Sequence, residues 1–96
     1  MEAHPGEFAY ATAGRDKGKC FIVIAVQDEY VYLCDGKGRK VSTPKKKKRK
    51  HVELTGVWDD FISNKLSSVG KLTNKEVRYS LSKFMGELVN GTQSGL

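Results

Sequence analysis

Residues 20–34 read CFIVIAVQDEYVYLC, and this stretch constrains the fold more than any other. Its first seven residues are apolar and rich in β-branched side chains, which predicts a strand that is covered on both faces. The polar residues 27–29 mark a turn. Residues 30–34 then alternate, so that Val31 and Leu33 lie on one face and the two tyrosines and the cysteine lie on the other. The stretch therefore predicts two consecutive strands.

Three shorter segments around this pair also have the composition of strands, namely residues 8–11, 39–42 and 51–54. Two glycines within residues 14–18 suit a turn in which the backbone takes positive φ or lets a partner approach closely. The dipeptide Asp35-Gly36 is a strong hairpin-turn signal. Five short strands with tight turns in about fifty residues predict a mainly β chain that forms a small, twisted barrel.

The hydrophobic period changes after Gly56. Trp58, Phe61 and Ile62 have the spacing of one helical turn. Thr73 followed by Glu76 fits a capping box at the start of a helix, and Asn90-Gly91 fits its end. The residues between form one apolar stripe: Val77, Leu81, Phe84, Met85 and Leu88.

We expect this stripe to pack on the outside of the barrel, where it would cover the all-apolar strand. The alternative is an exposed stripe that binds a partner helix. This divides the chain into a barrel, residues 1–56 with a basic loop at 43–50, and a helical extension, residues 57–96.

The positive charge of the chain is concentrated in its middle third. Residues 15–50 hold twelve lysines and arginines against four acids, a formal charge of +8, whereas the whole chain carries +6. Six of these cations are consecutive, at residues 45–50 between Pro44 and His51. Such a run opposes folding by self-repulsion unless a polyanion takes up the charge, which favours a nucleic-acid partner. The alternative is a flexible, solvated lysine loop.

The remaining chemistry-bearing residues predict neither a metal centre nor an enzyme. Cys20 and Cys34 lie in strand-like runs and are expected to be free, buried thiols. With His4 and His51 they would supply four zinc ligands, but no closely spaced ligand pair is present. We expect no cofactor and no catalytic group. No apolar stretch approaches the ~18 residues that cross a bilayer, and the start does not have the pattern of a signal peptide, so we expect a cytoplasmic protein.

Residues 14–23 (GRDKGKCFIV) followed by 30–36 (YVYLCDG) resemble a KOW motif. Residues 36–40 (GKGRK), the segment 44–47 (PKKK) and His51 resemble the downstream part of the KOW-containing large-subunit ribosomal proteins and the related small bacterial RNA-binding proteins. The resemblance implies an SH3-like barrel in which Gly18 holds the place of the signature glycine. It also implies RNA as the partner, most of all ribosomal RNA, with ribosomal proteins as further neighbours.

The expected role is binding without catalysis by a protein that is monomeric when free. Phosphate contacts are assigned to cations in three segments, which are Arg15, Lys17 and Lys19 beside Gly18, then Lys37, Arg39 and Lys40, then Lys45, Lys46, Lys47, Lys48, Arg49, Lys50 and His51. Tyr30 and Tyr32 either stack on unpaired bases or pack within the barrel. The alternative function is a nuclear-targeted protein-interaction module in which Pro44 to Lys50 is an import signal.

Overall fold

The computed structural model describes residues 2–93, with side chains over residues 2–86. The first part of the chain forms one five-stranded antiparallel sheet, and two helices follow it. The elements are β1 (Glu7–Ala11), β2 (Cys20–Gln27), β3 (Tyr30–Cys34), β4 (Lys45–Lys48), β5 (Val52–Trp58), α1 (Asp60–Ser68) and α2 (Asn74–Gln93). The spatial order of the strands is β4-β3-β2-β1-β5.

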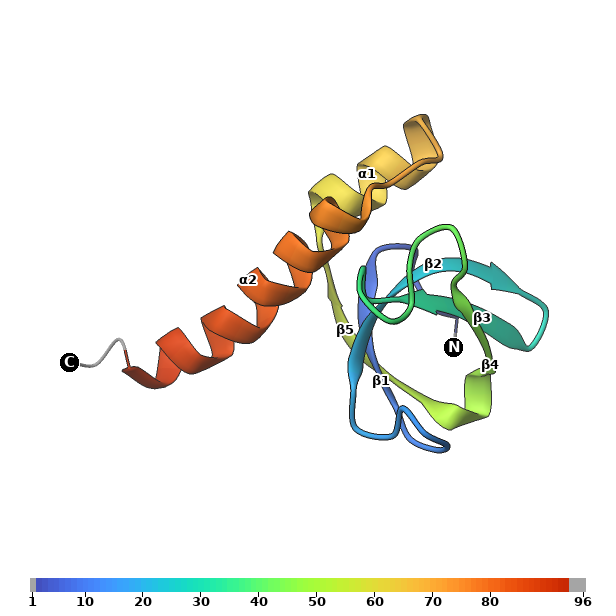
Figure 1. Cartoon of the computed structure of the whole chain (residues 1–96), viewed down its shortest axis with the longest axis horizontal. Helices are drawn as coiled ribbons and strands as arrows, with labels where there is room; N and C mark the ends of the chain where they lie inside the picture. The colour runs from blue at the N-terminus through green and yellow to red at the C-terminus, as the bar shows by residue number, and fades with distance from the viewer. Residues whose placement is uncertain (1, 94–96) are drawn as a thin grey trace.

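The sheet curls strongly, and its two edge strands approach each other at one corner (Figure 1). A short 3-10 turn, Arg49–His51, joins these edges, β4 and β5, directly. The ladder of strand pairs stops at both edges, so the sheet is open and does not form a closed barrel. The prediction of five short strands followed by a helical part is confirmed, but the strands do not close into the predicted barrel.

Each face of the sheet has its own hydrophobic core. Inside the curl, Phe21 and Val23 of β2 pack with Val31 and Leu33 of β3. On the outside, Ile22 packs with apolar residues of both helices. Phe21, Ile22, Val23, Val31 and Leu33 are each at most 1% exposed. The all-apolar strand is therefore covered twice over residues 21–23, as its composition predicts, whereas Ala25 and Val26 farther along it are exposed.

The helices that cover the outer face begin at side-chain caps. Asp59 accepts hydrogen bonds from the backbone N–H groups of Phe61 (2.9 Å) and Ile62 (3.3 Å) at the start of α1. At α2 the capping box is confirmed: the Glu76 N–H donates to Thr73 Oγ1 at 3.1 Å, and the Thr73 N–H donates to Glu76 Oε1 at 2.9 Å. These bonds satisfy backbone donors that have no partner within the helix.

The apolar stripe of α2 packs on the sheet over its first turns. Val77 and Leu81 are buried, and Phe84 stacks on Phe8 with ring centroids 4.1 Å apart. Met85, by contrast, is 43% exposed. The side chain of Leu88 lies outside the described residues.

Three expected boundaries are wrong. Residues 39–42 do not form a strand; they belong to a loop that Asp35 and Asn74 hold by accepting backbone hydrogen bonds. The strand that pairs with β3 lies instead within the supposed basic loop, at Lys45–Lys48, because the register with β3 overrides the weak strand propensity of lysine. Consequently His51 belongs to the 3-10 turn, and the next strand starts at Val52.

Two details of the helical part also differ from expectation. Trp58 ends β5, where it stacks on His4 at 3.9 Å between ring centroids, and it does not belong to a helical turn. The second helix continues past Gly91 to Gln93. Glycine costs only about 1 kcal/mol relative to alanine in a helix, so it does not by itself end one.

Candidate nucleic-acid interface

The loop between β1 and β2 connects the cationic segments that lie far apart in the sequence. In this loop, residues 12–19, the Thr12 N–H donates to the His51 carbonyl oxygen at 2.9 Å. Lys47 Nζ donates to the Ala13 carbonyl oxygen at 2.7 Å. Arg39, from the loop between β3 and β4, donates to Asp16. The three segments predicted to contact RNA are therefore neighbours in space.

Within this cluster Asp16 engages two of the predicted cations. Arg39 binds one oxygen of Asp16 through Nε (3.1 Å) and Nη2 (2.9 Å), and Lys19 lies 3.5 Å from the other. Asp16 is only 7% exposed. Burial alone would raise the pKa of its carboxyl, but the hydrogen bonds and charge of Arg39, assisted by Lys19, hold that pKa below its usual range. Arg39 is thus a structural cation that fixes one loop against the other.

The strand β4 divides the lysine run between two faces. Lys45 and Lys47 pair with Leu33 and Val31, so they share the face of the inner core and are half-buried. Lys46 and Lys48 point the other way and are exposed. A strand places successive side chains on opposite faces, so the six adjacent cations do not form one uniform patch.

On that outer face the exposed lysines lie beside the two tyrosines. Tyr32 pairs with Lys46 and Tyr30 with Lys48 across the two strands. Lys46 Nζ lies 4.3 Å from the centroid of the Tyr30 ring, a cation–π contact. The Tyr32 hydroxyl donates to Gln27 Oε1 at 3.0 Å. We call Tyr30, Tyr32, Lys46 and Lys48 the tyrosine–lysine platform.

A bulge in β2 explains why the platform is not covered. The register between β2 and β3 shifts between Val23 and Ala25, and β2 changes from buried to exposed there. The helices cover the outer face near Ile22 and Cys34. The turn between β2 and β3 points away from both helices in Figure 1, which leaves this end of the outer face half-buried or exposed.

The other predicted contact residues fall into exposed and anchored groups. The exposed cations of the cluster are Arg15, Lys17, Lys37, Lys40 and Lys50, and none of them takes part in an ion pair within the described part of the chain. Arg49 is anchored, because its Nη1 donates to the Val52 carbonyl oxygen at 3.0 Å. Gly18 has φ +88°, and a Cβ placed there would meet nothing within 4 Å, so its backbone faces open space.

Sequence reasoning missed one cation of this region. Arg78, on α2, donates from Nη1 to the Gly36 carbonyl oxygen at 2.7 Å. Gly36 itself must be glycine, since its φ is +78° and a Cβ would lie 2.5 Å from the Asn74 carbonyl oxygen. No local pattern relates Arg78 to the turn at Gly36, so only the packing of the helix against the loop reveals it.

The cysteines and histidines do not form a metal site or a reactive thiol centre among the described residues. Both cysteines are free, and burial, with a smaller contribution from Asp35, raises the pKa of Cys34 to about 12. That thiol therefore stays protonated at neutral pH and is a poor nucleophile. Over the residues that the structure describes, no three His, Cys, Asp or Glu side chains are close enough to hold a metal ion.

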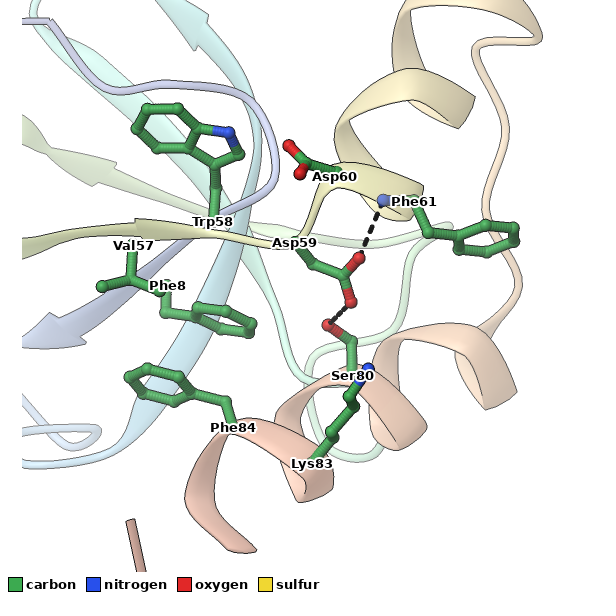
Figure 2. A pocket seen from close by; sticks show the side chains of 9 residues that line it. All are labelled: Phe8, Val57, Trp58, Asp59, Asp60, Phe61, Ser80, Lys83 and Phe84. Carbon is green, nitrogen blue, oxygen red and sulfur yellow. Dashed lines mark hydrogen bonds between the residues drawn. The ribbon is translucent and has the colours of Figure 1, made fainter. Parts of the chain in front are cut away.

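A pocket of about 400 Å³ lies where β5, α1 and α2 meet (Figure 2). One of its two carboxylates, Asp59, is used structurally: one oxygen caps α1, and the other accepts the Ser80 hydroxyl at 2.7 Å. Asp60, Lys83 and the aromatic ring of Phe84 are also part of the wall. The arrangement holds α1 against α2 and provides no activated nucleophile.

No protein-family model matches the chain, and no curated protein is significantly similar to it. No helix within residues 2–93 combines the length and apolar character that crossing a membrane requires.

Proposed function

We propose that this chain is an RNA-binding module of the KOW type with an SH3-like barrel, and that it contacts the phosphate backbone of structured RNA, most of all ribosomal RNA. The observation that carries the proposal is the joining of three cationic segments around the loop of residues 12–19. Apart from Lys19, which pairs with Asp16, the exposed cations of this cluster have no carboxylate partners among the described residues. A polyphosphate chain supplies the missing negative charge, and binding releases its counterions.

The predicted contact residues then take three roles. Exposed lysines and arginines bind phosphates, which positions the protein without reading sequence. The tyrosine–lysine platform offers aromatic faces to unpaired bases, each worth about 1–3 kcal/mol. Arg39, Lys47 and Arg49 hold the loops and edges in place through the bonds described above.

The order of the strands supports the SH3-like assignment. Strands β1 to β4 form a meander, and β5 returns to pair with β1. The 3-10 turn between β4 and β5 brings the two edges of the sheet together. Such curling places the β1–β2 loop next to the 3-10 turn, as the bond between Thr12 and His51 requires. Ribosomal RNA and neighbouring ribosomal proteins follow as partners from the KOW resemblance.

Binding to a structured ribosomal RNA fragment across a salt series tests the proposal. If about six phosphates are engaged, log K against log salt falls with a slope near −4 to −5. The variant Lys46→Ser/Lys48→Ser should weaken binding at least tenfold and make the slope shallower by about one to two units. Lys71→Ser/Lys75→Ser is the matched control, since it removes two exposed lysines of the helical part.

Weak binding with a flat salt slope contradicts the proposal. Unchanged RNA affinity in the Lys46→Ser/Lys48→Ser variant would instead favour the import signal, and a fluorescent fusion that then leaves the nucleus would identify it. Pairing of β4 with β3 holds Lys45–Lys48 within the sheet, so such a signal would have to be read from a folded strand.

A further inference from the structure

A groove separates the first half of α2 from the loops that carry the cations. Its volume is about 480 Å³. Its lining includes three exposed cations, Lys19, Lys37 and Arg78, which we call the rim, and three apolar side chains, Cys20, Leu81 and Met85, which we call the floor. The groove therefore combines side chains from a β-loop, a hairpin turn and a helix that no sequence motif connects.

Packing defines the two ends of this groove. At one end the turn at Gly36 is fixed to α2, because Arg78 donates to the Gly36 carbonyl and Asn74 Oδ1 accepts the Val41 N–H at 2.8 Å. Farther along, α2 runs away from the sheet (Figure 1). There Met85 remains 43% exposed, and its sulfur accepts the Tyr10 hydroxyl at 3.8 Å. Met85 is thus the apolar side chain of the floor that is exposed to solvent.

The charge of the rim selects for an anion. Asp35 is the acid that lines the groove, and its Oδ1 already accepts the backbone N–H groups of Lys37 and Arg39, both at 2.9 Å. Lys37 has no ion-pair partner among the described residues. Arg78 uses Nη1 on the Gly36 carbonyl, and its other N–H groups can bind a phosphate.

The floor suits a planar ring. Thioether sulfur makes favourable contacts with aromatic systems, and Met85 is the exposed apolar side chain of the floor, whereas Leu81 is only 9% exposed. Single-stranded RNA is commonly recognised through bases that are splayed out of the stack. A purely apolar groove would suit a peptide, and a purely basic one would suit phosphate alone.

We propose that this groove holds one unpaired nucleotide of the bound RNA, with its base against Met85 and its phosphate on Lys37 and Arg78. The inference rests on the proposed RNA-binding function and adds to it a second contact, distinct from the tyrosine–lysine platform. It assigns α2 a direct part in binding.

Two serine variants test the groove. Ser82→Glu places a carboxylate in its wall, and Ser67→Glu adds the same charge to an exposed position of α1 as the matched control. Each is titrated with a single-stranded RNA and with a duplex of the same length. Ser82→Glu should weaken single-strand binding about tenfold relative to the control, whereas the two variants should bind the duplex equally because it offers no unpaired base.

Uridine monophosphate provides a probe that needs no variant. At millimolar concentration it should shift the backbone amide resonances of Gly18, Lys19, Lys37 and Ser82 in the intact protein. Shifts confined to the tyrosine–lysine platform, or equal single-strand affinity for both serine variants, overturn the nucleotide groove while RNA binding stands. Absence of salt-dependent binding to any RNA overturns the proposed function itself.

Discussion

At the scale of single residues, Asp16 determines which cations remain available to a partner. Its carboxylate binds Arg39 and Lys19, two cations that the sequence predicts as RNA contacts. A buried hydrogen-bonded carboxylate that loses its charge leaves its partner unsatisfied. The ion pair between Asp16 and Arg39 joins two loops that carry most of the exposed cations of the cluster. Asp16 therefore stabilises the cationic surface whose charge it partly neutralises.

Asp16→Asn should lower the free energy of unfolding at pH 7 by about 1–2 kcal/mol. Because the pKa of Asp16 is held below its unfolded value near 3.9, this stabilisation is present above that pH and is lost as the pH falls through the folded pKa. Urea denaturation at pH 7 and pH 3 should therefore show a difference between wild type and variant that shrinks in acid. Glu29→Gln, at an exposed acid, is the control, and a pH-independent difference would contradict the assignment.

At the scale of the elements, the first turn of α2 contacts both α1 and the loop between β3 and β4. Thr73 and Glu76 form the capping box, and Glu76 also pairs with Lys65 of α1. The hydrogen bond from Lys65, followed by that from the Thr73 N–H, holds the pKa of Glu76 below its usual range. This first turn also carries Asn74, which holds the loop that bears Lys37 and Arg39.

Thr73→Ala should cost about 1 kcal/mol of stability, because the start of α2 loses the hydroxyl that accepts the Glu76 N–H. Glu76→Gln should cost less, since it keeps a capping acceptor and removes only a partly exposed ion pair. Thermal denaturation of both variants, beside Thr43→Ala at an exposed loop position, measures the order of their stabilities. An equal loss of stability in all three variants would show that the capping box contributes nothing specific.

At the scale of the whole molecule, the two cores make the sheet and the helices one unit. Ile22 and Cys34 are fully buried only because Ile62, Val77 and Leu81 cover them. Removing the helices would expose the outer face of β2 and β3 to water. The sequence-based division at residue 56 separates two parts that share a hydrophobic core.

The fragment 1–58 should therefore lack a cooperative unfolding transition and a dispersed amide spectrum. A chain that ends at Gly86 is the control, because it keeps every helix residue of the outer core within the described side chains. That chain and the full chain should both unfold cooperatively. A fragment 1–58 that folds by itself would contradict the shared core.

Local signals were sufficient for several elements. Residues 20–34 specified β2 and β3 because an apolar run and an alternating run each carry a clear period, and the two-residue exchange between Thr73 and Glu76 located the start of α2. The concentration of positive charge in residues 15–50 is likewise a property of the sequence. These features depend on neighbours in the chain.

Tertiary structure alone decided the rest. A run of lysines has no alternation, so no local pattern predicts which of them face inward. The pairing with Val31 and Leu33 decides this. A register shift of one residue would move every side chain of the strand to the opposite face of the sheet. Asp16 meets Arg39, and Arg78 meets Gly36, across 23 and 42 residues of chain. Such contacts depend on how the sheet curls and where the helix lies on it, because long-range packing fixes both.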